Sequence, residues 1–139
     1  MDFLLFNSYF MKYLLIGNGA REHALGEAIV RSSQKPELIV YADKINPGLK
    51  KIATVYEKTD NLLDLEKLKI LAEREKPEFA IVGPEAPIAA GAVDMLESLG
   101  IGCIAPRKNP GKLESSKAFT RALLKKYDIK LFIHGLLSL

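Results

Sequence analysis

Two short stretches place glycines directly beside charged side chains. Gly17, Asn18 and Gly19 follow the apolar run 13–16, and Arg21 stands at the start of a helical pattern that carries Ala24, Leu25, Ala28 and Ile29 on one face. Glycines permit a tight turn and a close approach of the backbone to a ligand. A helix N-terminus has N–H groups without internal partners and a partial positive charge, so this arrangement is typical of a phosphate site. Compact packing of a strand on a helix is the alternative interpretation of the same turn.

The second stretch follows another apolar run, at 79–82. Its residues are Gly83, Pro84 and Glu85, then Ala86 and Pro87. A carboxylate can accept two hydrogen bonds from a diol such as that of ribose, whereas a solvated loop acid is the alternative. On residue type alone, His23 is expected to pack or cap rather than to catalyse.

The order of apolar runs and helical patterns predicts the fold class. Strands are expected at 12–16, 38–42, 52–56, 79–82 and 103–105, with a loop at 44–48. Helices are expected at 21–32, from 60 or 61 to 76, around 89–99 and from 109 to 127, with a restart or kink at Ser115-Ser116. This alternation predicts an α/β fold, an open five-stranded parallel sheet with helices on both faces and strand order 3-2-1-4-5. The loops at Gly17 and Gly83 would then face one crevice, at the switch point of the sheet.

Composition excludes several classes of function. The 139 residues carry a net charge of +3, and basic residues mostly alternate with acidic ones, which argues against a nucleic-acid surface. The single cysteine, Cys103, lies in an apolar run, cannot form an internal disulfide and is expected to be a buried apolar residue. A single cysteine suits a reducing cytoplasm, which is the expected location. Residues 1–10 are apolar but too short for a signal peptide or a membrane span.

Three motifs in order carry a resemblance to a known family. They are GNGAREHAL at Gly17–Leu25, IVGPEAPIAAG at Ile81–Gly91 and LESSKAFTRALLKKYDI at Leu113–Ile129. From Met11 to about Ile129 the chain resembles the leading domain of phosphoribosylamine–glycine ligase, also called glycinamide ribonucleotide synthetase. That family consists of ATP-grasp enzymes of de novo purine biosynthesis, and the resemblance implies a Rossmann-like pre-ATP-grasp domain.

The resemblance also implies roles for particular residues. The residues that it implies in binding of the substrate phosphoribosylamine are Gly17, Asn18, Gly19, Ala20, Arg21, Glu22, Asn46, Pro47, Gly48, Gly83, Pro84 and Glu85. Of these, the loop at Gly17 matches the 5′-phosphate site and Glu85 the contact to the ribose hydroxyls. Lys117 matches a lysine that reaches ATP phosphates, although it is one of four lysines between Lys112 and Lys126 and a solvated helix face is its default interpretation. Ala20 stands where the family usually has a second glycine.

The expected organisation has three parts. Residues 1–10 are an N-terminal extension, 11–129 form the substrate-binding domain, and 130–139 are an apolar tail in place of the start of the ATP-grasp region. We therefore expect a chain that binds the sugar phosphate but is inactive as a ligase by itself. No catalytic residue, metal or cofactor is assigned to it, whereas the full-length family uses ATP and magnesium.

Two other functions remain open at this point. A dinucleotide-binding Rossmann domain is supported by Gly17-x-Gly19 after a strand and by Asp43 at the end of the second strand, where a ribose-binding acid is expected. Glu22 argues against it, because the third glycine of that motif should stand there. The other alternative is a non-catalytic truncated module that self-associates through its apolar tail.

Overall fold

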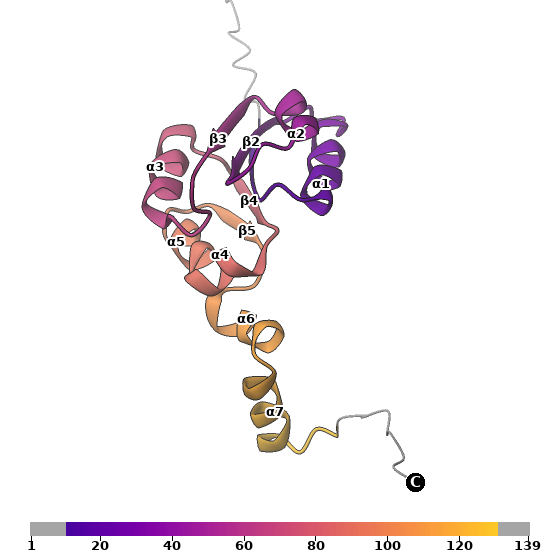
Figure 1. Cartoon of the computed structure of the whole chain (residues 1–139), viewed down its shortest axis with the longest axis vertical. Helices are drawn as coiled ribbons and strands as arrows, with labels where there is room; N and C mark the ends of the chain where they lie inside the picture. Colours follow the sequence, from indigo (N-terminus) through magenta and orange to yellow (C-terminus); the bar gives the residue numbers. More distant parts are fainter. Residues whose placement is uncertain (1–10, 131–139) are drawn as a thin grey trace, which may run out of the picture.

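The computed structural model describes residues 11–130, which form one parallel sheet with helices on both faces (Figure 1). The strand order is β3-β2-β1-β4-β5. The α/β class and the strand order are both confirmed. The strands are β1 (Lys12–Ile16), β2 (Glu37–Ala42), β3 (Val55–Lys58), β4 (Phe79–Val82) and β5 (Gly102–Ile104). The helices are α1 (Ala20–Val30), α2 (Pro47–Ile52), α3 (Leu65–Glu75), α4 (Glu85–Ala90), α5 (Ala92–Ser98), α6 (Lys108–Ser115) and α7 (Lys117–Lys126). The predictions for residues 1–10 and 131–139 lie outside the described residues.

Strand β1 lies at the centre of the sheet. Leu15 is paired with Val40 of β2 on one side and with Ile81 of β4 on the other. Leu14, Leu15 and Ile16 are fully buried, which explains why this strand is a continuous apolar run rather than an alternating one. The carboxyl ends of β1, β2 and β4 therefore meet at one edge, and the loops that follow them start side by side.

Each face of the sheet has its own apolar core. Helices α1 and α2 cover the face that carries Leu15 and Val40, and Leu49 of α2 packs in this core. Helices α3 and α5 cover the opposite face, where Leu68 and Leu96 pack on the sheet. Helices α6 and α7 extend away from the sheet, beyond α4 (Figure 1). Among residues 11–130, no helix combines the length and apolar character that a bilayer span requires.

Several predicted element boundaries are wrong. Residues Pro47–Ile52 form helix α2, because Asn46 caps its N-terminus and proline suits the first helical position. Strand β3 consequently starts at Val55 instead of 52. Helix α3 is capped by Asp64 rather than by Asp60 or Asn61.

The predicted third helix is divided into α4 and α5 by Gly91, whose φ of 104° breaks the helical conformation. The predicted restart at Ser116 is confirmed, since its side chain caps α7.

The inward face of α1 also differs from the prediction. Glu22 and Gly26 are its buried residues, while Leu25 is 37% exposed and Ala24 and Ala28 face solvent. Helix α1 lies so close to α2 that a Cβ atom at Gly26 would come within 2.6 Å of Leu49 Cδ2. Close packing therefore selects the glycine side of the helix, although the larger apolar residues lie elsewhere.

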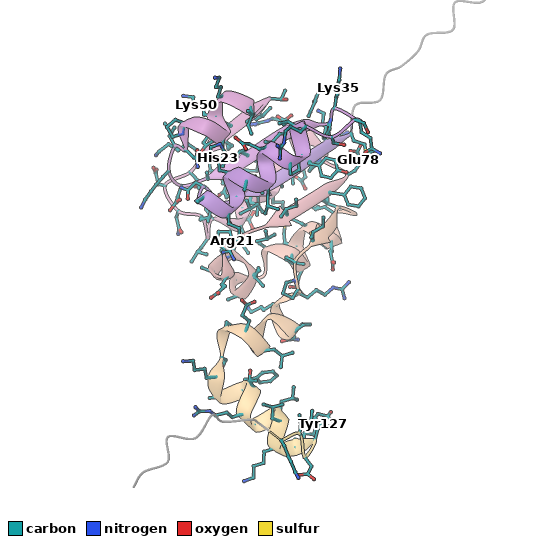
Figure 2. All side chains as sticks on the ribbon, turned by 90° about the vertical axis from the view of Figure 1, so that its right-hand side faces the viewer. Arg21, His23, Lys35, Lys50, Glu78 and Tyr127 are labelled. Carbon is teal, nitrogen blue, oxygen red and sulfur yellow. The ribbon has the colours of Figure 1, made fainter. Side chains whose placement is uncertain are left out.

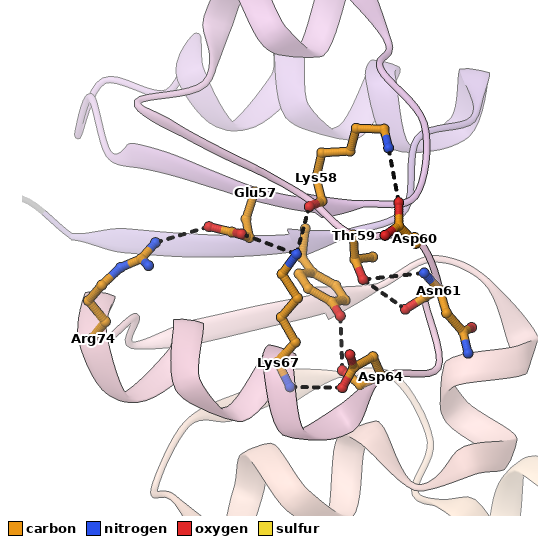
Figure 3. Close-up of polar contacts among 9 residues, drawn as sticks. Glu57, Lys58, Thr59, Asp60, Asn61, Asp64, Lys67 and Arg74 are labelled. Atoms are coloured by element: carbon orange, nitrogen blue, oxygen red, sulfur yellow. Dashed lines mark hydrogen bonds and ion pairs between the residues drawn. The ribbon is translucent and has the colours of Figure 1, made fainter.

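The edge strand β3 is tied to α3 by charged side chains (Figure 3). The Glu57 carboxylate lies 3.6 Å from Lys67 Nζ and 3.3 Å from Arg74 Nη2. Asp64 caps α3 by accepting a hydrogen bond from the backbone N–H of Lys67. Because Lys67 and Arg74 are partly exposed, these ion pairs orient the edge strand more than they stabilise the fold.

Tyr41 gives a prediction for stability at high pH. Its side chain is fully buried, and its hydroxyl donates a hydrogen bond of 2.9 Å to the carbonyl oxygen of Asp64. Burial raises the pKa of Tyr41, and the nearby Asp64 and Glu57 carboxylates act in the same direction. The unfolded chain releases this proton at about pH 10, whereas the folded chain retains it. The free energy of unfolding should therefore fall as the pH rises above about 10.

Urea unfolding at pH 8 to 11 measures this effect in the wild type and in Tyr41→Phe. At pH 8 the free energy of unfolding of Tyr41→Phe should be about 1 kcal/mol below that of the wild type, because the hydrogen bond is lost. Above pH 10 the free energy of unfolding of the variant should decline less steeply. Tyr127→Phe is the matched control, because Tyr127 is 62% exposed. An equally steep decline in Tyr41→Phe and in the wild type would contradict the prediction.

Candidate functional site

Three loops converge at the carboxyl edge of the central strands. The backbone N–H of Gly17 donates to the carbonyl oxygen of Tyr41 in β2, and that of Gly83 donates to Ile16 in β1. Gly17 has a φ of 119°, which favours glycine, and a Cβ atom there would lie 2.9 Å from the ring of Pro84. The loops at Gly17 and Gly83, which were predicted to share a crevice, are thus in contact.

The start of α1 leaves backbone donors at this edge of the sheet. Gly19 is the N-cap, and Ala20 and Arg21 are the first helical residues, so their N–H groups have no acceptor within the helix. Ala20 is helical, and alanine at this position therefore causes no backbone strain. The Arg21 side chain is 73% exposed and can turn toward a ligand.

Glu22 points inward, under the loop. Glu22 is only 5% exposed, and its Oε2 atom accepts a hydrogen bond of 2.7 Å from the N–H of Gly19. Its Oε1 atom lies 3.4 Å from Nε of Arg21. Reasoning from the sequence missed this contact. The spacing was a usable signal, because an acid three residues after an N-cap often bonds back to the N-cap N–H.

The loop after β2 braces the first loop from the other side. The Asn46 side chain donates to the carbonyl oxygen of Asn18 at 2.9 Å and accepts from the N–H groups of Gly48 and Leu49. The Asn18 side chain in turn donates to Asp43 Oδ1 at 2.9 Å. The predicted site residues Asn46, Pro47 and Gly48 therefore belong to the same loop cluster, and they cap a helix as well.

His23 is a packing residue, in line with its sequence interpretation. A Cβ atom at Gly48 would overlap its imidazole ring, so the glycine makes room for the ring between α1 and α2. Figure 2 shows His23 on the side of α1 that faces α2, where Lys50 lies. Its Nε2 atom is 3.5 Å from Glu27 on its own helix.

Glu85 begins α4 directly after Pro84 and is exposed. It lines a small hollow, of about 10 Å³, together with Glu114 and Ser115 of α6. Because Pro84 rests on Gly17, Glu85 lies one residue beyond the contact of the two loops. The loops that carry the predicted substrate-binding residues therefore meet at one edge of the sheet, and Glu85 follows that meeting point at the start of α4.

Comparison with known proteins decides the family. Residues 11–114 match the model of the phosphoribosylglycinamide synthetase N domain. The chain belongs to this family. The resemblance seen in its three motifs is confirmed.

Two curated relatives show how much of the family this N domain represents. The chain is 44% identical over 120 residues to a phosphoribosylamine–glycine ligase of Methanococcus vannielii, covering 86% of this chain and 27% of the relative. For the ligase of Pyrococcus furiosus the identity is 43% over 119 residues, covering 86% and 26%. The chain thus spans about a quarter of the length of these relatives.

A solved structure supports the fold. The N domain aligns with glycinamide-RNase-transformylase T from Mycobacterium tuberculosis at a TM-score of 0.63 and 18% identity, covering 84% of this chain and 35% of that one. At this identity the likeness shows a shared fold and carries no residue roles.

Lys117 lies apart from the loop cluster. It is the first residue of α7, which extends away from the sheet (Figure 1). With Leu113, Thr120, Arg121 and Leu124 it lines a separate groove of about 180 Å³. Two cationic side chains thus border an apolar groove, which is compatible with a phosphate contact but is not part of the first site.

The described part of the N domain offers neither a cluster of three metal-ligating side chains nor a readily ionised thiol. Between residues 11 and 130, no three His, Cys, Asp or Glu side chains are close enough together to hold an ion. Cys103 is half-buried, and this burial raises the pKa of its thiol to about 11. Such a thiol is almost entirely protonated near neutral pH, which disfavours a nucleophilic role.

Proposed function

We propose that this N domain binds phosphoribosylamine, the sugar-phosphate substrate of phosphoribosylamine–glycine ligase. That enzyme joins glycine to phosphoribosylamine in purine biosynthesis. The observation that carries the proposal is the contact of Pro84 with Gly17. Glu85 follows Pro84 directly and is exposed, and the loop on the other side of this contact ends in helix N–H groups that have no acceptor within the helix. A phosphate and a ribose diol attached to it can be recognised by these two groups together.

Each part of the site has a distinct task. The N–H groups of Ala20 and Arg21, the helix dipole and the Arg21 guanidinium attract the phosphate. Glu85 accepts hydrogen bonds from the ribose hydroxyls. The side-chain bonds of Asn18 and Asn46 hold the loop in place before the ligand arrives, which lowers the entropy lost on binding.

We further propose that this chain alone performs no ligation. Phosphoryl transfer depends on metal ions and cationic groups that surround the transferred phosphate. The described residues offer no metal-binding cluster, and the chain spans only about a quarter of its relatives' length. Lys117 would contact ATP phosphates only when the rest of a ligase is present. ATP and magnesium would then supply the driving force and charge neutralisation.

Two measurements test this function. Isothermal titration of the chain with ribose 5-phosphate should show saturable binding, and inorganic phosphate should bind more weakly because it lacks the ribose. An assay with phosphoribosylamine, glycine, ATP and magnesium should show no ADP release above background. Absence of ribose 5-phosphate binding would refute the substrate role, and glycine-dependent ADP release would refute the proposed inactivity.

The alternatives have less support. A dinucleotide would need the Gly19 N–H and an acid such as Asp43, but Glu22 and Asn18 already engage these groups. Titration with NAD tests this alternative in the same experiment. Self-association through the tail remains a prediction, because residues 131–139 lie outside the described residues. Sedimentation of the chain with and without residues 130–139 tests it.

A further inference from the structure

The Glu22 side chain occupies the space that three glycines leave open. A Cβ atom at Gly83 would overlap the Glu22 carboxylate, and one at Gly19 would come within 2.7 Å of Oε2. A Cβ atom at Gly17 would come within 2.9 Å of Glu22 Cγ. The glycines of both loops are therefore shaped around this side chain. Together with the ring of Pro84, the Glu22 side chain fills the volume between the loop after β1 and the loop after β4.

Dinucleotide-binding sites of the same strand-turn-helix form have a glycine at the position of Glu22. In dinucleotide-binding sites the second glycine lets the backbone approach a pyrophosphate, and the third glycine allows close packing of helix and strand. Here Gly19 is the second position and Glu22 the third. The carboxylate at the third position takes the N–H of the second, so a backbone donor that a second phosphate would use is already bonded to an anion.

The negative charge of Glu22 also disfavours a second phosphate. The carboxylate is almost completely shielded from water, and its cationic neighbour in the loop is Arg21, at 3.4 Å. One phosphate can use Arg21 together with the N–H groups of Ala20 and Arg21. A second phosphate would have to approach the buried carboxylate, and like charges at close range in a partly buried site repel strongly.

We propose that Glu22 is a specificity-determining residue that restricts this site to ligands with a single phosphate group. This inference rests on the proposed sugar-phosphate function. In the bound state Glu22 keeps its hydrogen bond to Gly19, holds the two loops in register and excludes pyrophosphate-containing ligands by both volume and charge.

Glu22→Gln separates charge from shape. Glutamine keeps the length of the side chain and an oxygen that can accept the Gly19 N–H, but it carries no charge. Isothermal titration compares ribose 5-phosphate with ADP-ribose, in which the same sugar phosphate carries a second phosphate and an adenosine. Because the adenosine is the same for both proteins, a change in preference between the wild type and Glu22→Gln reports on the second phosphate. We expect the preference for ribose 5-phosphate over ADP-ribose to fall by about tenfold in the variant.

Glu27→Gln is the matched control. It removes one negative charge from the same helix, but the Glu27 side chain is 54% exposed. The preference of Glu27→Gln for ribose 5-phosphate over ADP-ribose should equal that of the wild type. An unchanged preference in Glu22→Gln would overturn the role of Glu22 while the sugar-phosphate function stands. Failure of the wild type to bind ribose 5-phosphate would overturn both.

A measurement on the wild type covers the case in which Glu22→Gln does not fold. Amide NMR during titration with ribose 5-phosphate should show larger shifts for Ala20 and Arg21 than for Gly19, and Gly19 should keep its protection from hydrogen exchange. Loss of that protection on binding would mean that the phosphate displaces Glu22, which contradicts the proposal.

Discussion

Arg21→Ala is expected to weaken ribose 5-phosphate binding by about 10- to 100-fold while the domain stays folded. A hydrogen bond to a charged group contributes about 1.5–3 kcal/mol, and in the proposed function Arg21 makes such a bond with the phosphate. Its side chain is 73% exposed, so its removal leaves no cavity. Glu22 loses a cationic neighbour but keeps the N–H of Gly19, which limits the change within the loop.

Isothermal titration gives the affinity, and urea unfolding checks that the fold is intact. Arg31→Ala is the matched control: Arg31 caps the other end of α1 and lies in solvent. It removes the same charge at the far end of the same helix, so its affinity should change by less than about twofold. Equal affinities of Arg21→Ala and the wild type would remove Arg21 from the site.

Asn46→Ala is expected to lower the free energy of unfolding by about 2 kcal/mol. Loss of a helix cap typically costs about 1 kcal/mol. Loss of the hydrogen bond to the Asn18 carbonyl adds about 1 kcal/mol. Both contacts come from this one side chain, which caps α2 and supports the glycine loop. Ribose 5-phosphate binding should weaken as well, since the loop is no longer held in its binding conformation.

Asn46→Asp divides these two contributions. Aspartate keeps the oxygen that caps α2 but has no N–H to donate to Asn18, so about half of the stability loss should remain. Urea unfolding at neutral pH and titration with ribose 5-phosphate measure stability and affinity separately. If the two variants were equally stable, the contact with Asn18 would contribute nothing. If Asn46→Ala were as stable as the wild type, the capping geometry would be irrelevant to the fold.

Two elements differ from what their local sequence patterns predict. The buried face of α1 carries Glu22 and Gly26, although its alanines and Leu25 suggested a different apolar stripe. The turn preferences of Asn46, Pro47 and Gly48 predict a loop where the structure has the start of helix α2. The same residues start a helix once the Asn46 side chain is placed to cap it.

The amino-acid sequence by itself determined the α/β class, the strand order and the meeting of the loops at Gly17 and Gly83. These follow from local patterns and from the restricted chirality and length of strand connections. Only the tertiary structure decided that the Glu22 side chain is buried between the loop after β1 and the loop after β4. That outcome depends on the space at Gly83, more than sixty residues along the chain. Which partner a buried polar group finds is set by packing in three dimensions.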